Sequence, residues 1–462
     1  MMMPYLGPSS HAQFRGRVGT GFGAVRLDQT PTWSRPAGPG FAPGRQTVFD
    51  GGVIWVSLAF SLIFALVAVL TYAPLRREPF SVVCFIATFV VGELPVHAAL
   101  VVLAGTVAFA TDVSDHGWAW WTALIVGLVT TGAFAGLAVV AHGAGRLVDA
   151  SLDEAIGGPI VAEGIDLRPA WATWWRLVLA VPFRFRSIRR IRNVDYAGHG
   201  RHRNKLDVLV RRSDPPTAGP VLVYIHGGAW VIGDKREQGV PMMQELAARG
   251  WVCVAINYRL SPKATWPDHV VDCKLALAWV REHIADYGGD PSFLAVSGGS
   301  AGGHLSALVA LTPNEPEWQP GFEDADTSVD ACIPFYGVHD VTGDPESSGI
   351  HGPGLVDLLQ RRVMKITVEE DRNSFERASP DRRVSETAPP MYVIQGANDT
   401  LVPTQVARRF VERLGAVSGA PVAYLELPCA QHAFDILLSI RSRHTCLGAV
   451  RFLEGIRQRS SP

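Results

Sequence analysis

Ser300 lies at the centre of a glycine-rich stretch whose spacing suits a nucleophile. The sequence Gly298-Gly299-Ser300-Ala301-Gly302 follows an apolar run typical of a strand and precedes a stretch typical of a helix. A serine on such a sharp turn exposes its hydroxyl, and glycines two residues away on either side avoid clashes with the strand and the helix. The pattern therefore predicts nucleophilic chemistry at Ser300.

The same glycines do not fit the loops that bind phosphate groups. A Walker loop requires a lysine just after its last glycine, and no lysine lies between Lys274 and Lys365. The dinucleotide-binding pattern G-x-G-x-x-G fails as well, because Ser300 stands two residues after Gly298, where that pattern needs a glycine. We therefore expect no nucleotide cofactor.

A serine hydroxyl is a weak nucleophile and needs a base and an orienting acid. His432, in the sequence QHAFD, follows the last predicted strand and precedes the last predicted helix. Asp399, in the sequence GANDTLVP, follows the preceding predicted strand. We predict that His432 takes the proton of Ser300 and that Asp399 holds the imidazole in place.

Backbone amides that could bind a developing oxyanion are present in the sequence HGGAW, residues 226–230. This sequence follows the apolar run VLVYI, and its glycines allow the amides of Gly227 and Gly228 to turn toward a substrate carbonyl oxygen. The amide of Ala301, at the start of the predicted helix, would complete the oxyanion hole. We predict these three donors.

Four other residues compete for the roles of acid and base. Asp435 closely follows His432, and Asp340 follows another predicted strand, so that either is an alternative acid. His226 and His304 are alternative bases, although we expect His226 to support the oxyanion loop and His304 to pack within its helix.

The elements that must position these residues read as an α/β fold. Apolar strands alternate with helical stretches such as residues 239–249 and 270–284, which predicts a mostly parallel sheet covered on both faces. In such sheets, sites form at the carboxyl ends of strands, where all the candidates lie. We expect the domain at residues 193–462, with a lid-like insertion at about 341–388. The predicted strands are residues 205–212, 220–228, 251–259, 293–300, 331–337, 390–396 and 421–427.

The first third of the chain is apolar enough to enter a membrane. Residues 51–73 and 118–141 carry no charge, and each run is long enough to cross about 30 Å of hydrocarbon. Residues 80–111 are interrupted by Glu93, Pro95 and His97, and form either one kinked span or a re-entrant pair. We predict a multi-pass transmembrane region at residues 51–145 with about three spans, which fits the pattern better than buried helices of a soluble core.

The flanking segments suggest a tail, a linker and an orientation. Residues 1–50 have the composition of a disordered tail. Residues 146–192 are predicted to be an amphipathic linker. Its seven arginines at 168–192 either contact an anionic bilayer surface or form the solvent-exposed face of a helix that leads into the next domain. Arg76 and Arg77 between the first two spans favour a cytoplasmic sheet domain, and a further crossing within 80–111 would reverse this.

Charge and cysteine content narrow the choice of ligands. The 42 basic and 43 acidic residues give a net charge of −1 and no overall field that would attract nucleic acid. The six cysteines show no paired spacing, so neither a disulfide framework nor a metal site is indicated. We expect no metal and no nucleic-acid partner.

Five ordered motifs together resemble the α/β-hydrolase superfamily, and most of all its hormone-sensitive-lipase-like branch of bacterial carboxylesterases and lipases. They are HGGAW, NYRLSP, YGGDPSFLAVSGGSAGGHLS, GANDTLVP and QHAFD, and the resemblance covers about residues 193–458. It implies Ser300, Asp399 and His432 as the catalytic triad and Gly227, Gly228 and Ala301 as the oxyanion hole. Membrane-anchored members with similar N-terminal regions are familiar.

The chain departs from the common motifs of that branch in two places. Ala229-Trp230 replaces the end of H-G-G-G, and Gly299 stands where many members have aspartate in G-D-S-A-G. The first departure is similar to relatives that cleave small esters or aryl formamides, and argues against long-chain triacylglycerol hydrolysis. We predict a membrane-anchored serine hydrolase that cleaves small-molecule or lipid esters through an acyl-enzyme on Ser300, with membrane lipids as partners. The alternatives are an amidase or arylformamidase on the same triad, or a non-catalytic membrane scaffold.

Overall fold

The computed structural model describes residues 44–112, 116–156, 185–213, 217–345 and 354–460, together with Ala180 and Pro215. By its contacts the chain divides into Met1–Val48 and Phe49–Pro462, and the second unit contains the sheet and the apolar helices from Phe49 onward. The predicted tail lies almost entirely outside the described residues.

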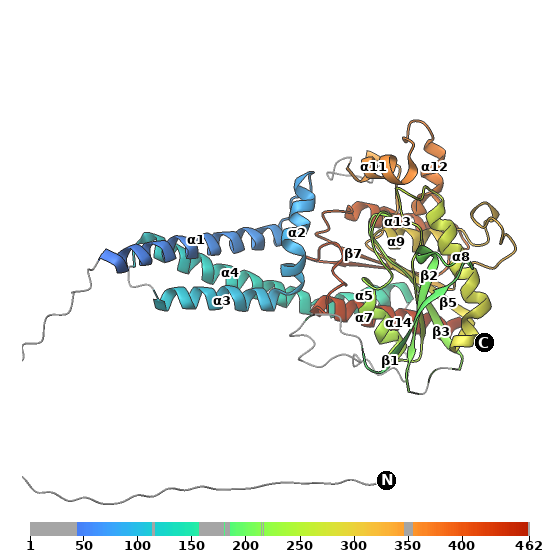
Figure 1. Cartoon of the computed structure of the whole chain (residues 1–462), viewed down its shortest axis with the longest axis horizontal. Coiled ribbons are helices and arrows are strands. Elements are labelled where there is room, and N and C mark those ends of the chain that lie inside the picture. Colours follow the sequence, from blue (N-terminus) through green and yellow to red (C-terminus); the bar gives the residue numbers. More distant parts are fainter. Residues whose placement is uncertain are drawn as a thin grey trace, which may run out of the picture. The chain divides into compact units, whose positions relative to one another are not determined.

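Residues 185–460, which we call the sheet domain, are built on an eight-stranded sheet (Figure 1). The strand order is β1-β2-β4-β3-β5-β6-β7-β8; β1 and β2 pair antiparallel, as do β2 and β4, and the other pairs are parallel. The predicted mostly parallel sheet is therefore confirmed. The strands are β1 Ile188–Asp195, β2 Lys205–Arg211, β3 Gly219–Ile225, β4 Val252–Ile256, β5 Gly289–Gly299, β6 Ala331–Phe335, β7 Met391–Gly396 and β8 Val422–Leu427.

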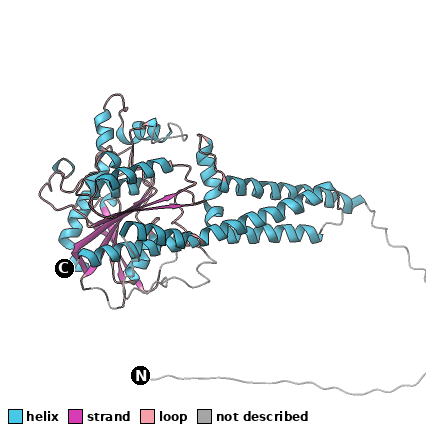
Figure 2. Ribbon diagram, turned by 180° about the vertical axis from the view of Figure 1, so that it is seen from behind, coloured by secondary structure: helices cyan, strands magenta, loops and turns pink. Residues whose placement is uncertain are grey.

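Helices cover both faces of this sheet (Figure 2). Successive residues of β3 enter opposite cores, with Val223 in one and Leu222 and Tyr224 in the other, because side chains alternate along a strand. This explains why β3 reads as a continuous apolar run. One core contains α8 Asp268–His283, α9 Ala301–Leu311 and α13 Thr404–Val417, and the other contains α5 Ala144–Ile156, α7 Val240–Ala248 and α14 Ile440–Ser460.

The sheet begins earlier than the sequence predicts. The edge strand β1 starts at Ile188, inside the segment interpreted as a linker that ends at residue 192. An edge strand tolerates exposed arginines, and an irregularity in the pairing between Ile191 and Val194 breaks the alternation that would have revealed the strand. Residues 157–179 and 181–184 of the predicted linker lie outside the described residues.

The insertion, residues 341–388, consists of short helices beside the carboxyl ends of the strands. They are α11 Gly354–Leu358, a π-helix Leu359–Met364, α12 Arg372–Arg377 and a 3₁₀ turn Pro380–Arg382, and residues 346–353 lie outside the described part.

The apolar helices are α1 Gly44–Tyr72, α2 Phe80–Glu93, α3 Pro95–Asp112 and α4 Trp118–His142. Among the described residues, α1 and α4 are long and apolar enough to cross a membrane. Helices α2 and α3 are bent by 91° relative to each other, and they add a third span only if the pair is counted as one. The break lies just before Pro95, because proline has no backbone N–H and cannot continue the hydrogen bonding of α2. In both views α1, α3 and α4 run side by side, while α2 lies across their end next to the sheet domain (Figures 1 and 2).

Candidate active site

Ser300 lies on the turn between β5 and α9 in a strained backbone conformation. Its φ of 58° and ψ of −121° are unusual for a residue with a side chain and are typical of a serine held out from a sheet. The Ser300 amide donates to the carbonyl of Phe335 at 3.0 Å, which ties the turn to the neighbouring strand. A Cβ at Gly227 would lie 2.5 Å from the carbonyl oxygen of Gly299 and 3.0 Å from Cβ of Ser300, so the surroundings require glycine there.

Asp399 and His432 come together although 33 residues separate them. The Nδ1 of His432 lies 2.7 Å from Oδ2 of Asp399, which is fully buried. The other carboxylate oxygen accepts the amides of Leu401 and Val402 at 2.8 Å each, and Gln395 Nε2 donates to Oδ2 at 3.1 Å. An ionised carboxylate that accepts from Nδ1–H fixes the imidazole tautomer, leaving Nε2 able to take a proton.

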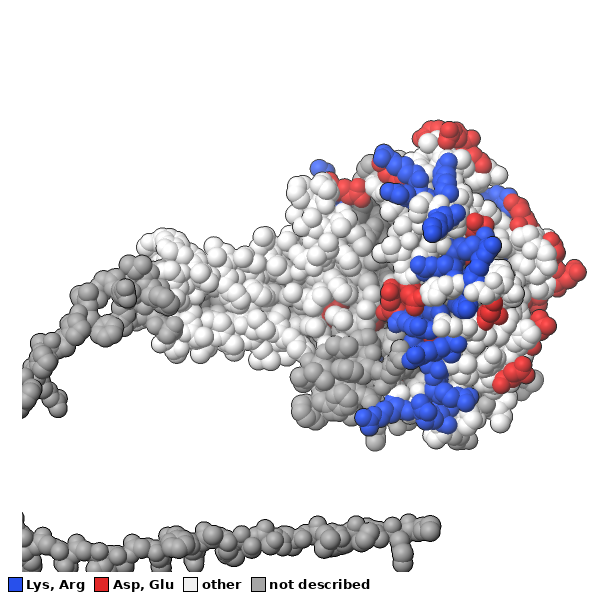
Figure 3. All heavy atoms as spheres, viewed as in Figure 1, with Lys and Arg blue, Asp and Glu red and all other residues white. Residues whose placement is uncertain are grey.

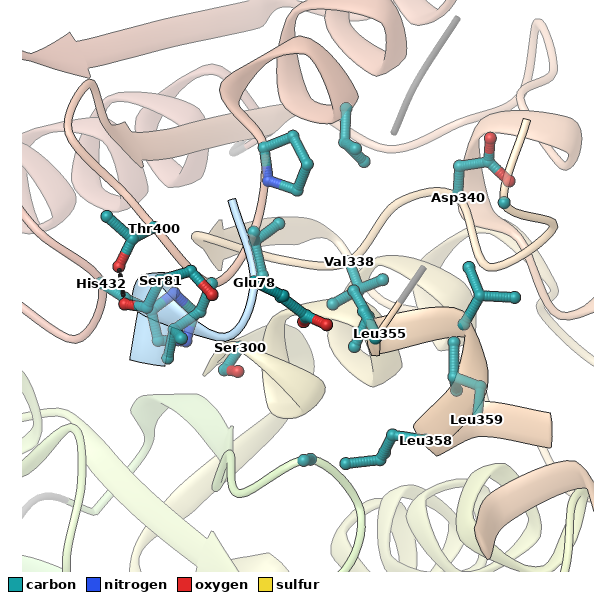
Figure 4. A pocket seen from close by; sticks show the side chains of 18 of the residues that line it. Glu78, Ser81, Ser300, Val338, Asp340, Leu355, Leu358, Leu359, Thr400 and His432 are labelled. Carbon is teal, nitrogen blue, oxygen red and sulfur yellow. Dashed lines mark hydrogen bonds between the residues drawn. The ribbon is translucent and has the colours of Figure 1, made fainter. Parts of the chain in front are cut away.

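Ser300 and His432 line the same pocket, which has a volume of about 200 Å³ (Figure 4). Its polar lining includes Ser81, Thr400 and Asp340, and the remaining wall is mostly aliphatic. Apolar walls of this kind accommodate an acyl or alkyl group and exclude water from the reacting atoms. The aliphatic wall contains Val338, Leu355, Val356, Leu358, Leu359 and Val402.

The oxyanion loop differs from its prediction at one position. The amide of Gly227 donates to Oε1 of Gln238 at 2.7 Å, so this donor is taken by the protein itself. The amides of Gly228, Ala229 and Ala301 donate to no group in the described part of the chain, and Ala229 lines the pocket with a φ of 51°. Ala229, which the sequence did not suggest, therefore replaces Gly227 among the candidate donors.

The two alternative bases have structural contacts instead. Nδ1 of His226 lies 2.7 Å from the carbonyl of Gly227, and burial lowers the pKa of His226 to about 4. His304 accepts Trp230 Nε1 at 3.3 Å and donates from Nε2 to the carbonyl of Ala378 at 2.7 Å. Burial lowers the pKa of His304 to about 4 as well, so both rings stay neutral and support their loops.

The two alternative acids are also engaged elsewhere. Asp435 accepts the hydroxyl of Tyr336, and burial raises the pKa of Asp435. Asp340 lines the pocket, but its Oδ1 accepts the amide and the hydroxyl of Thr342 at 2.8 and 2.7 Å. Of the three candidate aspartates, Asp399 is the one that an observed hydrogen bond joins to His432.

The apolar helices contribute to the pocket, which the sequence did not indicate. Glu78, in the linker between α1 and α2, and Ser81, at the start of α2, both line it (Figure 4). The hydroxyl of Thr400 donates to the carbonyl of Ser81 at 2.9 Å, and the rings of Phe85 and His432 lie 6.1 Å apart. No local pattern could reveal these contacts, because more than 300 residues separate the partners, as between Ser81 and Thr400.

Potential metal ligands were compared across the described part of the chain. Within the residues that the structure describes, no three His, Cys, Asp or Glu side chains are placed to hold an ion. The six cysteines are all free thiols, and five of them are buried.

Known proteins with a similar sequence include esterases. The chain is 43% identical to the probable carboxylic ester hydrolase LipM of Mycobacterium tuberculosis, over 86% of this chain and 92% of LipM. The chain belongs to the α/β-hydrolase family of carboxylic ester hydrolases. It is 46% identical to the esterase LipQ of the same organism over 55% of this chain and 60% of LipQ, and the BD-FAE family matches residues 206–414.

Solved structures share the fold of the sheet domain. Esterase B from Lactobacillus rhamnosis aligns with a TM-score of 0.51 and 21% identity, over 60% of this chain and 88% of that structure. This similarity supports the fold alone. The match to LipM covers too much of the chain to be confined to the sheet domain, so this esterase also resembles LipM in part of its apolar helices.

Proposed function

We propose that this esterase is a membrane-anchored serine hydrolase in which Ser300, His432 and Asp399 form the catalytic triad. The observation that carries the proposal is the 2.7 Å bond between His432 Nδ1 and buried Asp399, beside the pocket that Ser300 lines. These side chains come from three separate loops at the carboxyl ends of β5, β7 and β8.

The reaction follows from the chemistry of these groups. Ser300 Oγ attacks the ester carbonyl carbon while His432 Nε2 takes its proton, and the imidazolium is stabilised by the Asp399 carboxylate. The amides of Gly228, Ala229 and Ala301 bind the developing oxyanion. His432 then gives the proton to the leaving alkoxide, and an acyl-enzyme remains on Ser300. Water, deprotonated by His432, releases the carboxylic acid by the same route.

The apolar helices serve as the membrane anchor in this proposal. Their outward side chains are large and exposed, for example Ile63 and Val129 at 60% and 67%, and water would not stabilise so continuous an apolar surface. Arg76 donates to the carbonyl of Ala397 in the sheet domain at 2.8 Å. The Arg76-Arg77 pair and the sheet domain therefore share one side of the membrane, which the positive-inside rule makes the cytoplasmic side.

Replacing the nucleophile tests this function. Ser300→Ala should abolish hydrolysis of p-nitrophenyl butyrate by the purified full-length protein, with an unchanged thermal unfolding transition. Ser306→Ala is the matched control, because this buried hydroxyl lies within α9, donates to the carbonyl of Gly303 and does not line the pocket. Retained activity in Ser300→Ala would refute the assignment.

A further inference from the structure

Helix α2 has its polar and apolar faces in an unusual arrangement. Small or polar residues form its buried face, whereas its exposed face is entirely apolar. A helix on the surface of a soluble domain shows the opposite pattern, with its apolar stripe turned inward. The buried residues are Ser81, Cys84, Thr88, Gly92 and Glu93, and the exposed ones are Phe80, Val82, Val83, Ile86 and Val90.

The buried face of α2 is attached to the loops that carry the triad. Thr88 Oγ1 accepts from Gln431 Nε2 at 3.2 Å, and Gln431 directly precedes His432. At the other end of the helix, Glu93 forms a fully buried ion pair with Arg441 at 2.8 Å. Together with the bond between Ser81 and Thr400, these contacts hold α2 against two catalytic loops and, at its C-terminal end, against the start of α14.

The exposed face of α2 continues the apolar surface of the spanning helices. The bend of 91° places α2 across the direction of α3, which packs along α4. With α3 and α4 aligned to the membrane normal, α2 lies parallel to the membrane plane. Figure 3 shows the apolar helices as a largely uncharged surface and the charged residues gathered on the sheet domain. No residue from Phe80 to Gly92 carries a charge.

We propose that α2 lies in the bilayer surface with its exposed face among the acyl chains, and that it forms the membrane-side wall of the catalytic pocket. The substrate is then an ester of a membrane-resident lipid. It enters the pocket from the bilayer, so that its acyl chains remain in apolar surroundings. Glu78, just before α2, and Ser81, in its first turn, line the pocket together with Leu355 and Leu358 of the insertion, and we place the entry of the lipid where these segments meet. This inference rests on the proposed esterase function and specifies its substrate class.

The bilayer is a better occupant of this face than a partner protein. The face is continuous with the helices that are long enough to span a membrane, and an apolar face at the interface depth gains affinity from burial among lipid tails. Ile86, at 70% exposed, and Val83, at 64%, are the most exposed residues of α2.

A charged residue introduced on the exposed face of α2 should affect the hydrolysis of membrane lipids more than the hydrolysis of dissolved esters. Ile86→Asp should lower hydrolysis of dioleoylglycerol in phosphatidylcholine vesicles at least tenfold, and change hydrolysis of dissolved p-nitrophenyl butyrate less than twofold. Val417→Asp, on an exposed valine at the end of α13, is the control and should change neither rate. Equal effects of Ile86→Asp on both substrates, or no effect on either, would overturn the inference.

The wild-type protein provides a second test that no folding defect can obscure. In vesicles that contain a phosphatidylcholine with a photoactivatable acyl chain, illumination should attach lipid to residues 80–90 as well as to the spanning helices. Lipid adducts confined to α1, α3 and α4, or cross-links from α2 to a second protein copy, would overturn the inference. Wild type that cleaves dissolved butyrate but not vesicle dioleoylglycerol refutes the substrate class alone, whereas failure on both esters refutes the esterase proposal itself.

Discussion

Replacing Asp399 by asparagine should disable the base without disturbing the fold. The two amides of Leu401 and Val402 can still bond the remaining side-chain oxygen. The new amide NH₂ faces His432 Nδ1, which must then act as acceptor and move its proton to Nε2, where it blocks proton transfer from Ser300. The wrong tautomer lowers kcat by about 10⁴, or about 5 kcal/mol of transition-state stabilisation. Loss of the charge-assisted bond lowers the unfolding free energy by about 2 kcal/mol.

The assay compares Asp399→Asn with Asp435→Asn on p-nitrophenyl butyrate. Asp435 accepts from Tyr336 rather than from His432, so its replacement should lower kcat less than about tenfold. KM should change little in Asp399→Asn, because the substrate does not contact this buried residue. Circular dichroism and thermal melts monitor folding. The reasoning is refuted if Asp399→Asn stays within tenfold of wild type, or if Asp435→Asn has the larger effect.

Three further outcomes follow from the packing. Gly227→Ala should lower kcat at least about 100-fold, since its Cβ collides with the turn that holds Ser300, and a rate near wild type would contradict this geometry. Glu93→Gln should lower the unfolding free energy by about 3–5 kcal/mol by leaving Arg441 buried without its partner, as measured by urea denaturation in detergent. The unfolded state protonates His304 near pH 6.5, whereas burial lowers its folded pKa to about 4. The contribution of His304 to stability is therefore complete above pH 6.5 and is lost toward pH 4 by up to about 3 kcal/mol, and His226 and His269, whose pKa burial also lowers to about 4, act in the same direction; a pH-independent melting temperature would argue against it.

Local patterns predicted the parts of the site that are encoded locally. The turn at Ser300 needs glycines within two residues, and Asp399 and His432 each follow a strand that reads clearly as apolar. The fold followed from the same strands, because a parallel sheet buries both of its faces. Strand β1 escaped prediction because its arginines suit an edge that water still reaches.

Long-range contacts were beyond the reach of such patterns. Gln238 captures the amide of Gly227 from eleven residues away, so the sequence alone could not show that Ala229 is left as the available donor. The α2 wall of the pocket depends on the bend next to Pro95 and on polar residues that meet the sheet domain only after folding. An apolar run in the sequence indicates a membrane span, but it does not reveal that part of that run borders a catalytic pocket.

The most direct test of the triad assignment is the site of covalent labelling by a fluorophosphonate in the full-length protein. Mass spectrometry of wild type should find one adduct per chain, on the peptide that contains Ser300, and none in Ser300→Ala. Asp399→Asn should react much more slowly, since its base holds the wrong tautomer. Labelling at another serine, or labelling that persists in Ser300→Ala, would contradict the proposed mechanism.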